Sequence, residues 1–154
     1  MSSPYPTPPP CSAGKGESPT PASAPGSLLT AAPSGDAREL LGAEELMTVT
    51  ATLARLHPNM GWVMAEQVIN EALKFVAAAA RCGEALVPSP LVDAGWHALI
   101  ENTEVYQHLN RRLGGFVHHY PAVVGGVQPA PGWEERTAAA IERAGFTVDK
   151  ELWA

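Results

Sequence analysis

The apolar residues that follow residue 35 recur every three or four positions, which is the period of an α-helix. The first such series places four apolar side chains on one face, namely Leu46, Val49, Leu53 and Leu56. Asp36 followed by Glu39 resembles a capping box, and His57-Pro58 ends the series. We therefore predict a first helix between these two signals.

Three further helices follow from the same period and from their end signals. Asn59 is a suitable N-cap for a long, alanine-rich helix that stops at Cys82-Gly83. Ser89-Pro90 is typical of an N-cap followed by proline at the first helical position. Asn102-Thr103 separates this third helix from a fourth, which ends at Gly114-Gly115.

The buried face of each of these helices can be read from the spacing. The second should bury Ala65, Val68, Ala72, Phe75, Val76 and Ala79. The third and fourth should bury Val92, Trp96, Leu99, Tyr106, Leu109 and Leu113. The small side chains of the second helix should allow a neighbouring helix to approach closely.

The stretch 116–132 is rich in glycine and proline, so we predict an ordered loop and not a strand. A last helix is predicted from Trp133 to Ala144, with Gly145 as its stop signal. The apolar residues beyond it should fold back on the core, namely Phe146, Val148, Leu152 and Trp153. The expected fold is an all-α, compact bundle of about five helices with an ordered His-His loop.

The first 35 residues differ from the rest in composition. They contain nine of the 15 prolines, mixed with serine, alanine and glycine, a composition that does not offset the entropy lost on ordering a backbone. We predict a disordered tail over 1–35 and a helical domain over 36–154. A domain of this length can bury a core without a disulfide or a structural metal.

Charge and cysteine usage narrow the choice of partners and compartment. A net charge of -6 leaves no basic face for phosphates, so neither nucleic acid nor an acidic membrane surface is an expected partner. No segment approaches the ~20 continuous apolar residues of a membrane helix, and the N-terminus lacks a secretory signal pattern. Cys11 and Cys82 have no second cysteine at metal or redox spacing. We expect a cytoplasmic protein that binds a small molecule or a protein partner.

The third helix carries the first candidate site. Asp93, His97 and Glu101 stand at i, i+4 and i+8, so their side chains point along one side. A histidine and a carboxylate at this spacing can bind one metal ion, or the carboxylate can orient the imidazole. In the alternative reading, the histidine is structural and hydrogen-bonds to its own helix.

His118 and His119 are the second candidates. Adjacent residues of an extended chain point to opposite sides, so we expect one of the two rings to face inward. Which ring does so stays open at this point. Three imidazoles, or two with a carboxylate, suit zinc, copper or non-haem iron. The candidate metal ligands are thus Asp93, His97, His118 and His119, for one transition-metal ion.

Other reactive side chains have simpler explanations. His57 and His108 should be solvated, Cys82 should be an inert small residue at a helix end, and Ser89 already serves as a cap. The sequence holds no phosphate-binding glycine loop, zinc-protease motif or EF-hand.

Several of these residues also form a recognisable pattern. It consists of Asp93-x-x-Trp96-His97, Thr103-x-x-Tyr106, and Phe116-x-His118-His119-x-Pro121 preceded by Gly114 or Gly115. The pattern resembles the bacterial glycine-rich domain-containing protein-like family, without the glycine-rich extension. The resemblance implies a helical domain in which the Trp-His helix and the His-His loop form one site. It implies no particular reaction.

Three functional hypotheses follow. The first is a metal-binding helical protein, with a metal-dependent enzyme as one form of it, because an open coordination position can activate water, oxygen or a small substrate. The second is a non-catalytic interaction module in which the histidines are structural. The third is a histidine acid/base enzyme without metal.

Overall fold

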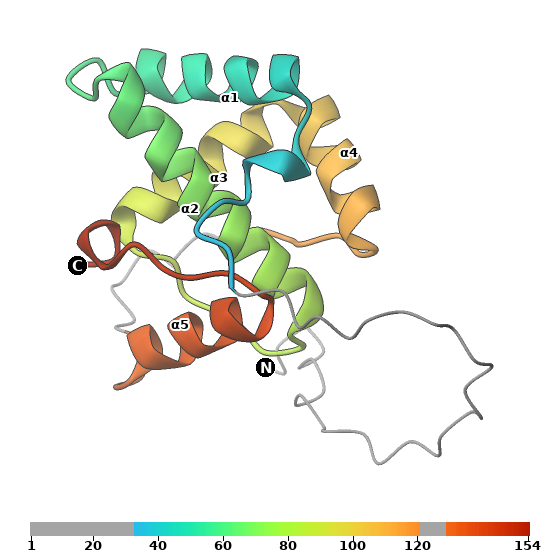
Figure 1. Cartoon of the computed structure of the whole chain (residues 1–154), viewed down its shortest axis with the longest axis vertical. Helices are drawn as coiled ribbons and strands as arrows, with labels where there is room; N and C mark the ends of the chain where they lie inside the picture. Colours follow the sequence, from blue (N-terminus) through green and yellow to red (C-terminus); the bar gives the residue numbers. More distant parts are fainter. Residues whose placement is uncertain (1–32, 121–128) are drawn as a thin grey trace, which may run out of the picture.

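The computed structural model describes residues 33–120 and 129–154, which form five α-helices and two short 3-10 helices (Figure 1). The α-helices are α1 (Ala43–Leu56), α2 (Trp62–Arg81), α3 (Pro90–Glu101), α4 (Thr103–Leu113) and α5 (Trp133–Arg143). The 3-10 helices are η1 (Arg38–Leu40) and η2 (Lys150–Leu152). Over these two ranges the structure contains no strand beyond an isolated bridge. The prediction of an all-α bundle of about five helices is confirmed.

The long helix α2 lies at the centre of the bundle and contacts each of the other four α-helices (Figure 1). Residues 71–78 are all buried. The predicted stripe is therefore only part of the buried surface, because helices and the C-terminal segment surround α2 on several sides. Phe75, at its middle, packs against the ring of Trp96 at 4.9 Å between ring centroids.

The close contact between α2 and α3 depends on a glycine. A Cβ atom at Gly95 would lie 3.0 Å from the backbone oxygen of Val68 and 3.0 Å from the Cβ of Ala72. A side chain at Gly95 would therefore push the helices apart. The expectation that small residues on α2 allow close approach is confirmed, and α3 contributes its own small residue.

One predicted helix start is confirmed in detail. The Val92 N–H donates to Ser89 Oγ at 3.2 Å, as expected for an N-cap. The Ser89 hydroxyl also donates to the Leu152 carbonyl at 2.7 Å. The cap residue therefore connects α3 to the C-terminal segment.

Two predicted helix starts were wrong. Helix α1 begins at Ala43, where the carboxylate of Glu45 accepts a hydrogen bond from the Gly42 N–H at 2.8 Å. Asp36 binds Arg38 two residues later instead of capping a long helix. Asn59 lies in the turn before α2, and the N-cap of α2 is Gly61. Both errors have the same cause. A polar residue just before a periodic stretch is a suitable N-cap in the sequence, but the tertiary structure determines where the backbone enters the helix.

The folded domain begins slightly earlier than predicted. The Ser34 N–H donates to the Gly145 carbonyl, and the Thr147 N–H donates to the Ser34 carbonyl, both at 2.9 Å. These bonds form a parallel bridge between Ser34 and Phe146. Residues 33–35 thus belong to the domain, whereas residues 1–32 of the predicted tail lie outside the described residues.

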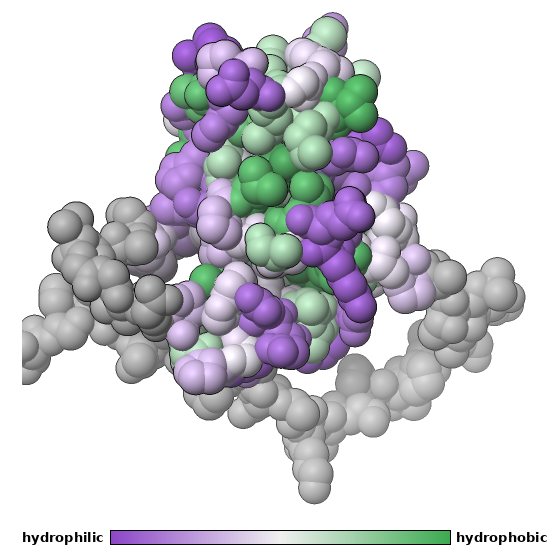
Figure 2. Space-filling model, turned by 90° about the vertical axis from the view of Figure 1, so that its left-hand side faces the viewer, coloured by the Kyte–Doolittle hydropathy of each residue, from purple (hydrophilic) through white to green (hydrophobic). Residues whose placement is uncertain are grey.

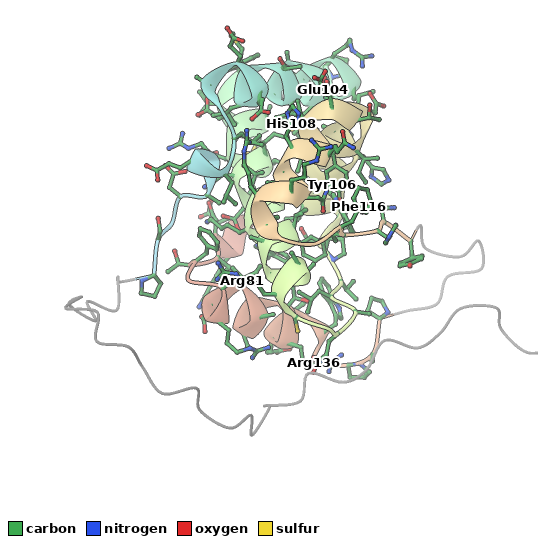
Figure 3. The ribbon with its side chains drawn as sticks, turned by 90° about the vertical axis from the view of Figure 1, so that its right-hand side faces the viewer. Arg81, Glu104, Tyr106, His108, Phe116 and Arg136 are labelled. Carbon is green, nitrogen blue, oxygen red and sulfur yellow. The ribbon has the colours of Figure 1, made fainter. Side chains whose placement is uncertain are left out.

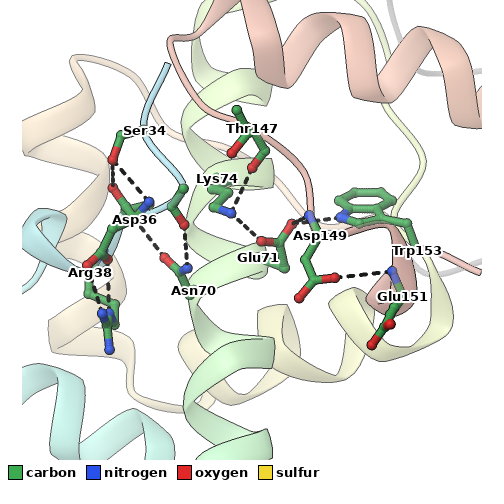
Figure 4. A network of polar contacts seen from close by, with 12 residues as sticks. Ser34, Asp36, Arg38, Asn70, Glu71, Lys74, Thr147, Asp149, Glu151 and Trp153 are labelled. Atoms are coloured by element: carbon green, nitrogen blue, oxygen red, sulfur yellow. Dashed lines mark hydrogen bonds and ion pairs between the residues drawn. The ribbon is translucent and has the colours of Figure 1, made fainter. Parts of the chain in front are cut away.

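The C-terminal segment packs on the core as predicted, and a buried ion pair fixes it (Figure 4). Lys74 donates hydrogen bonds to the Glu71 carboxylate and, at 2.8 Å, to the Thr147 carbonyl. The indole of Trp153 donates to the other Glu71 oxygen at 2.8 Å. A buried pair is tolerated when further hydrogen bonds complete it. The sequence does not reveal this anchor, because charged residues on an alanine-rich helix are normally exposed.

Some large apolar side chains remain on the surface. The face shown in Figure 2 has hydrophobic residues gathered toward its middle, among hydrophilic ones. Leu56, predicted to be buried, is 38% exposed because it lies in the last turn of α1. Trp62, Val63 and Met64, at the start of α2, are exposed as well. Among the described residues no helix is both long and apolar enough to cross a membrane.

Candidate metal centre

Helix α3 supplies two of the candidate ligands. Asp93 and His97 are one turn apart, and His97 Nδ1 lies 3.3 Å from Asp93 Oδ2. The same ring nitrogen lies 2.9 Å from the backbone carbonyl oxygen of Asp93. The His97 side chain is half exposed, so it can turn without disturbing the core.

The segment after α4 is tied back to the bundle by two residues of that helix. The Val117 N–H donates to Asn110 Oδ1 at 2.7 Å, and the Tyr106 hydroxyl donates to the Val117 carbonyl. Gly114, with φ of 79°, ends α4 in the left-handed conformation that favours glycine and turns the chain back. These contacts confirm an ordered segment up to residue 120, and residues 121–128 of the predicted loop lie outside the described residues.

His119 is brought to Asp93 by this segment. Its Nε2 lies 2.9 Å from Asp93 Oδ1, and its ring packs edge-on against Trp96 at 4.5 Å between centroids. The rings of His97 and His119 lie 4.4 Å apart. Each of Asp93, His97 and His119 offers a ligand atom within 4.8 Å of the others. We call these three residues the Asp93 cluster.

Two candidate residues lie elsewhere. His118 is exposed and its ring lies beside those of Phe116, at 4.8 Å, and Tyr120. Glu101 pairs with Arg55 at 3.3 Å. The expectation that one ring of the His-His pair faces inward is thus confirmed, and the inward ring is that of His119.

The remaining histidines lie away from this cluster. His57 is exposed, as expected. His108 was expected to be solvated, but its Nδ1 lies 3.2 Å from the Glu45 carboxylate. Arg112 donates to the same carboxylate at 2.8 Å. The guanidinium of Arg112 holds the pKa of Glu45 at about 2, with smaller contributions from the Gly42 N–H and His108. His108 therefore helps to join α4 to α1.

Trp96 and Tyr106 are core residues that connect α3 and α4 to the 116–119 segment. The Trp96 indole donates to the Tyr106 hydroxyl at 3.0 Å, and both side chains are almost fully buried. Burial raises the pKa of Tyr106, so its hydroxyl stays protonated. The sequence placed both residues in the core but did not reveal that they position the histidine loop. The Thr103-x-x-Tyr106 element of the sequence pattern is the signal that could have indicated this role for Tyr106.

The geometry of the Asp93 cluster is compatible with two states. Metal–ligand bonds of about 2.0–2.2 Å place neighbouring ligand atoms about 3.0–3.5 Å apart, close to the 2.9 Å between His119 Nε2 and Asp93 Oδ1. Without an ion, the Asp93 carboxylate forms a hydrogen bond with the His119 ring, and the Asp93 backbone carbonyl forms one with the His97 ring. His97 Nδ1 lies at hydrogen-bond distance from its own helix, so its N–H can donate to the Asp93 carbonyl while Nε2 would serve as the ligand atom, an arrangement common for metal-bound histidines.

The fold and the cluster define a small helical protein with a His/His/Asp group that could hold a metal ion. The chain belongs to the UCP032817-like family, whose model matches residues 43–130, more than half of its length. The matched part runs from the start of α1 past His119 and includes the whole Asp93 cluster. No curated protein and no solved structure gives a significant match. The family match does not link the chain to glycine-rich domain-containing proteins, so that resemblance remains an expectation.

Proposed function

We propose that this protein binds one divalent transition-metal ion through Asp93, His97 and His119. The observation that carries the proposal is the convergence of the three side chains from two separate segments, with ligand atoms within 4.8 Å of one another. Two imidazoles and one carboxylate suit zinc, copper or iron.

The proposed ion would retain open coordination positions. Three protein ligands leave at least one position of a tetrahedral ion, and three of an octahedral ion, for water or substrate. His97 and Asp93 are partly exposed, so solvent and small molecules can reach that side of the cluster. An ion held in this way can lower the pKa of a bound water or polarise a substrate. A metal-dependent enzyme acting on a small molecule or a peptide is the functional class that we propose.

Metal titration of the full chain, purified without a histidine tag and treated with a chelator, tests this proposal. We expect one ion per chain, measured by isothermal titration calorimetry with Zn²⁺, Cu²⁺ and, without oxygen, Fe²⁺. His97→Ala and His119→Ala should each weaken binding more than about 100-fold, since even residues outside the ligand set contribute 10-fold to 100-fold.

His118→Ala is the matched control, because it removes the neighbouring imidazole without touching the cluster. Its binding should equal that of the wild type. Stoichiometric binding that survives His97→Ala, or no binding of any of the three ions by the wild type, would exclude the metal site. The alternative of a non-catalytic interaction module would then be preferred, because the hydrogen bonds of Asp93 close the cluster without an ion.

A further inference from the structure

A groove of about 540 Å³ runs beside the Asp93 cluster, between the start of α4 and the 116–119 segment. The residues of its wall that bear on its chemistry are Thr103, Glu104, Tyr106, Gln107, Phe116 and His119. Figure 3 shows Glu104, Tyr106 and Phe116 on the same side of the molecule. Since His119 belongs to both the groove and the cluster, a molecule in the groove lies next to the proposed ion.

The aromatic part of the groove is held in place while remaining accessible. Phe116 is 57% exposed, yet its ring packs edge-on against Tyr106 at 5.6 Å between centroids. The hydrogen bonds of Val117 to Asn110 and Tyr106 fix the backbone next to Phe116. Binding sites commonly present such aromatic surface, supported by a rigid scaffold, to the apolar part of a ligand.

The charge of the groove is negative. Glu104 is the formally charged residue of its wall, and its carboxylate has no hydrogen bond or ion pair within the described parts of the chain. Glu45, Glu66 and Glu101 each pair with an arginine, whereas Glu104, like the surface residue Glu134, has no such partner among the described residues, and its place in the wall of the groove distinguishes it. An uncompensated carboxylate attracts cations, and the faces of aromatic rings attract them as well.

We propose that this groove binds a small organic cation, namely an amine with an apolar body. The ammonium group lies at Glu104, with Thr103 and Gln107 as additional hydrogen-bond partners. The apolar body lies against Phe116 and Tyr106 and extends toward His119. The binding step does not require an ion, whereas the role of the bound amine as a substrate rests on the metal site proposed above.

Two probes that differ in charge but share a phenylethyl body test the proposal. Chelator-treated full-length protein, labelled with ¹⁵N, is titrated with 2-phenylethylamine and separately with 3-phenylpropanoate while amide shifts are recorded. The amine should bind with a Kd of ~1–10 mM, the range that so few heavy atoms can provide. It should shift the amides of Gln107, Val117 and His118. The carboxylate should leave these amides unchanged up to about 20 mM.

Glu104→Gln should weaken binding of the amine about twofold to fivefold, the range expected for a solvent-exposed charge pair. Glu134→Gln is the matched control, because Glu134 is an exposed carboxylate in the first turn of another helix, α5. It should leave the Kd unchanged. Phe116→Ala should weaken binding of the amine as well, while the remaining amide shifts report an intact fold.

Equal shifts from both probes, shifts at other amides only, or an affinity for the amine that Glu104→Gln does not change would each overturn the proposal. Because the protein is free of metal in this experiment, its result is independent of the metal titration. Binding of the amine without metal binding would refute the metal site alone. Metal binding without binding of the amine would refute the groove alone.

Discussion

The indole nitrogen of Trp96 donates a hydrogen bond to the Tyr106 hydroxyl at 3.0 Å, and that hydroxyl donates in turn to the backbone carbonyl of Val117. Two helices and the segment that carries His119 thus meet at one oxygen atom. The ring of His119 rests on Trp96 as well. The position of His119 relative to Asp93 therefore depends on core residues that do not touch the Asp93 carboxylate.

Tyr106→Phe tests this dependence, because it removes the hydroxyl and keeps the ring. The substitution leaves Trp96 Nε1 and the Val117 carbonyl without their partner, so we expect a loss of about 1–3 kcal/mol in the free energy of unfolding. Metal affinity should also fall, since the His119 segment loses a tether. Urea denaturation and metal titration measure the two effects. A free energy of unfolding and a metal affinity equal to those of the wild type would show that the Tyr106 hydroxyl does not position the His119 segment.

Trp96→Ala should be more damaging. Trp96 is 6% exposed and packs against Phe75 and His119. Emptying a large aromatic site in a core costs roughly 3–5 kcal/mol, and we expect that loss in chemical denaturation. Denaturation like that of the wild type would mean that the indole contributes little to the core.

The pH dependence of metal binding provides an independent check of the Asp93 cluster. A protonated imidazole cannot bind an ion at the nitrogen that carries the proton, so protons and metal ions compete for the histidine ligands. The measured affinity should therefore fall as the pH is lowered. Isothermal titrations between about pH 5 and pH 8 measure the effect. An affinity that stays constant over this range would argue against histidine ligands.

Stability in acid should depend on Glu45. Its pKa is about 2 in the folded protein, below the ordinary value of 4.5, mainly because Arg112 donates to it. The stabilisation is therefore present above about pH 4.5 and is lost as the pH falls toward 2. Partial exposure reduces the contribution to roughly 1–2 kcal/mol.

Comparison of the wild type with Glu45→Gln between pH 7 and pH 2 isolates this contribution. The variant should be less stable at pH 7, and its stability should fall less on acidification. The pKa of Asp36 is also about 2, because of its contacts with Arg38. Asp36 is present in both proteins, so its contribution to stability in acid cancels in the comparison. Parallel pH curves for the two proteins would contradict the assignment.

The N-terminal boundary can be located by truncation. Deletion of residues 1–32 should leave the melting temperature nearly unchanged, because that composition contributes little apolar burial. Deletion of residues 1–35 should lower it measurably, since it also removes the bonds of Ser34 to Gly145 and Thr147. Calorimetry of both truncated chains tests the difference. Loss of several degrees on the shorter deletion would show that the first 32 residues contact the domain.

Features that depend on local interactions could be predicted from the order of the amino acids. Helical periodicity reflects contacts between residues three or four apart, so the class of fold and the approximate extent of α2 to α5 could be predicted. The Ser89 cap could be predicted because its hydrogen bond to Val92 spans three residues. The shared face of Asp93 and His97 follows from the helix alone.

Which histidine joins Asp93 could not be predicted and follows from the folded chain. His118 and His119 are neighbours with the same chemistry, and the choice depends on the path of a segment that Asn110 and Tyr106 hold. The burial of Glu71 likewise depends on Trp153, 82 residues away in the chain. Such contacts join residues far apart in sequence, and no local pattern encodes their distance. For this reason the candidate ligands could be named from the sequence, whereas the cluster that they form required the fold.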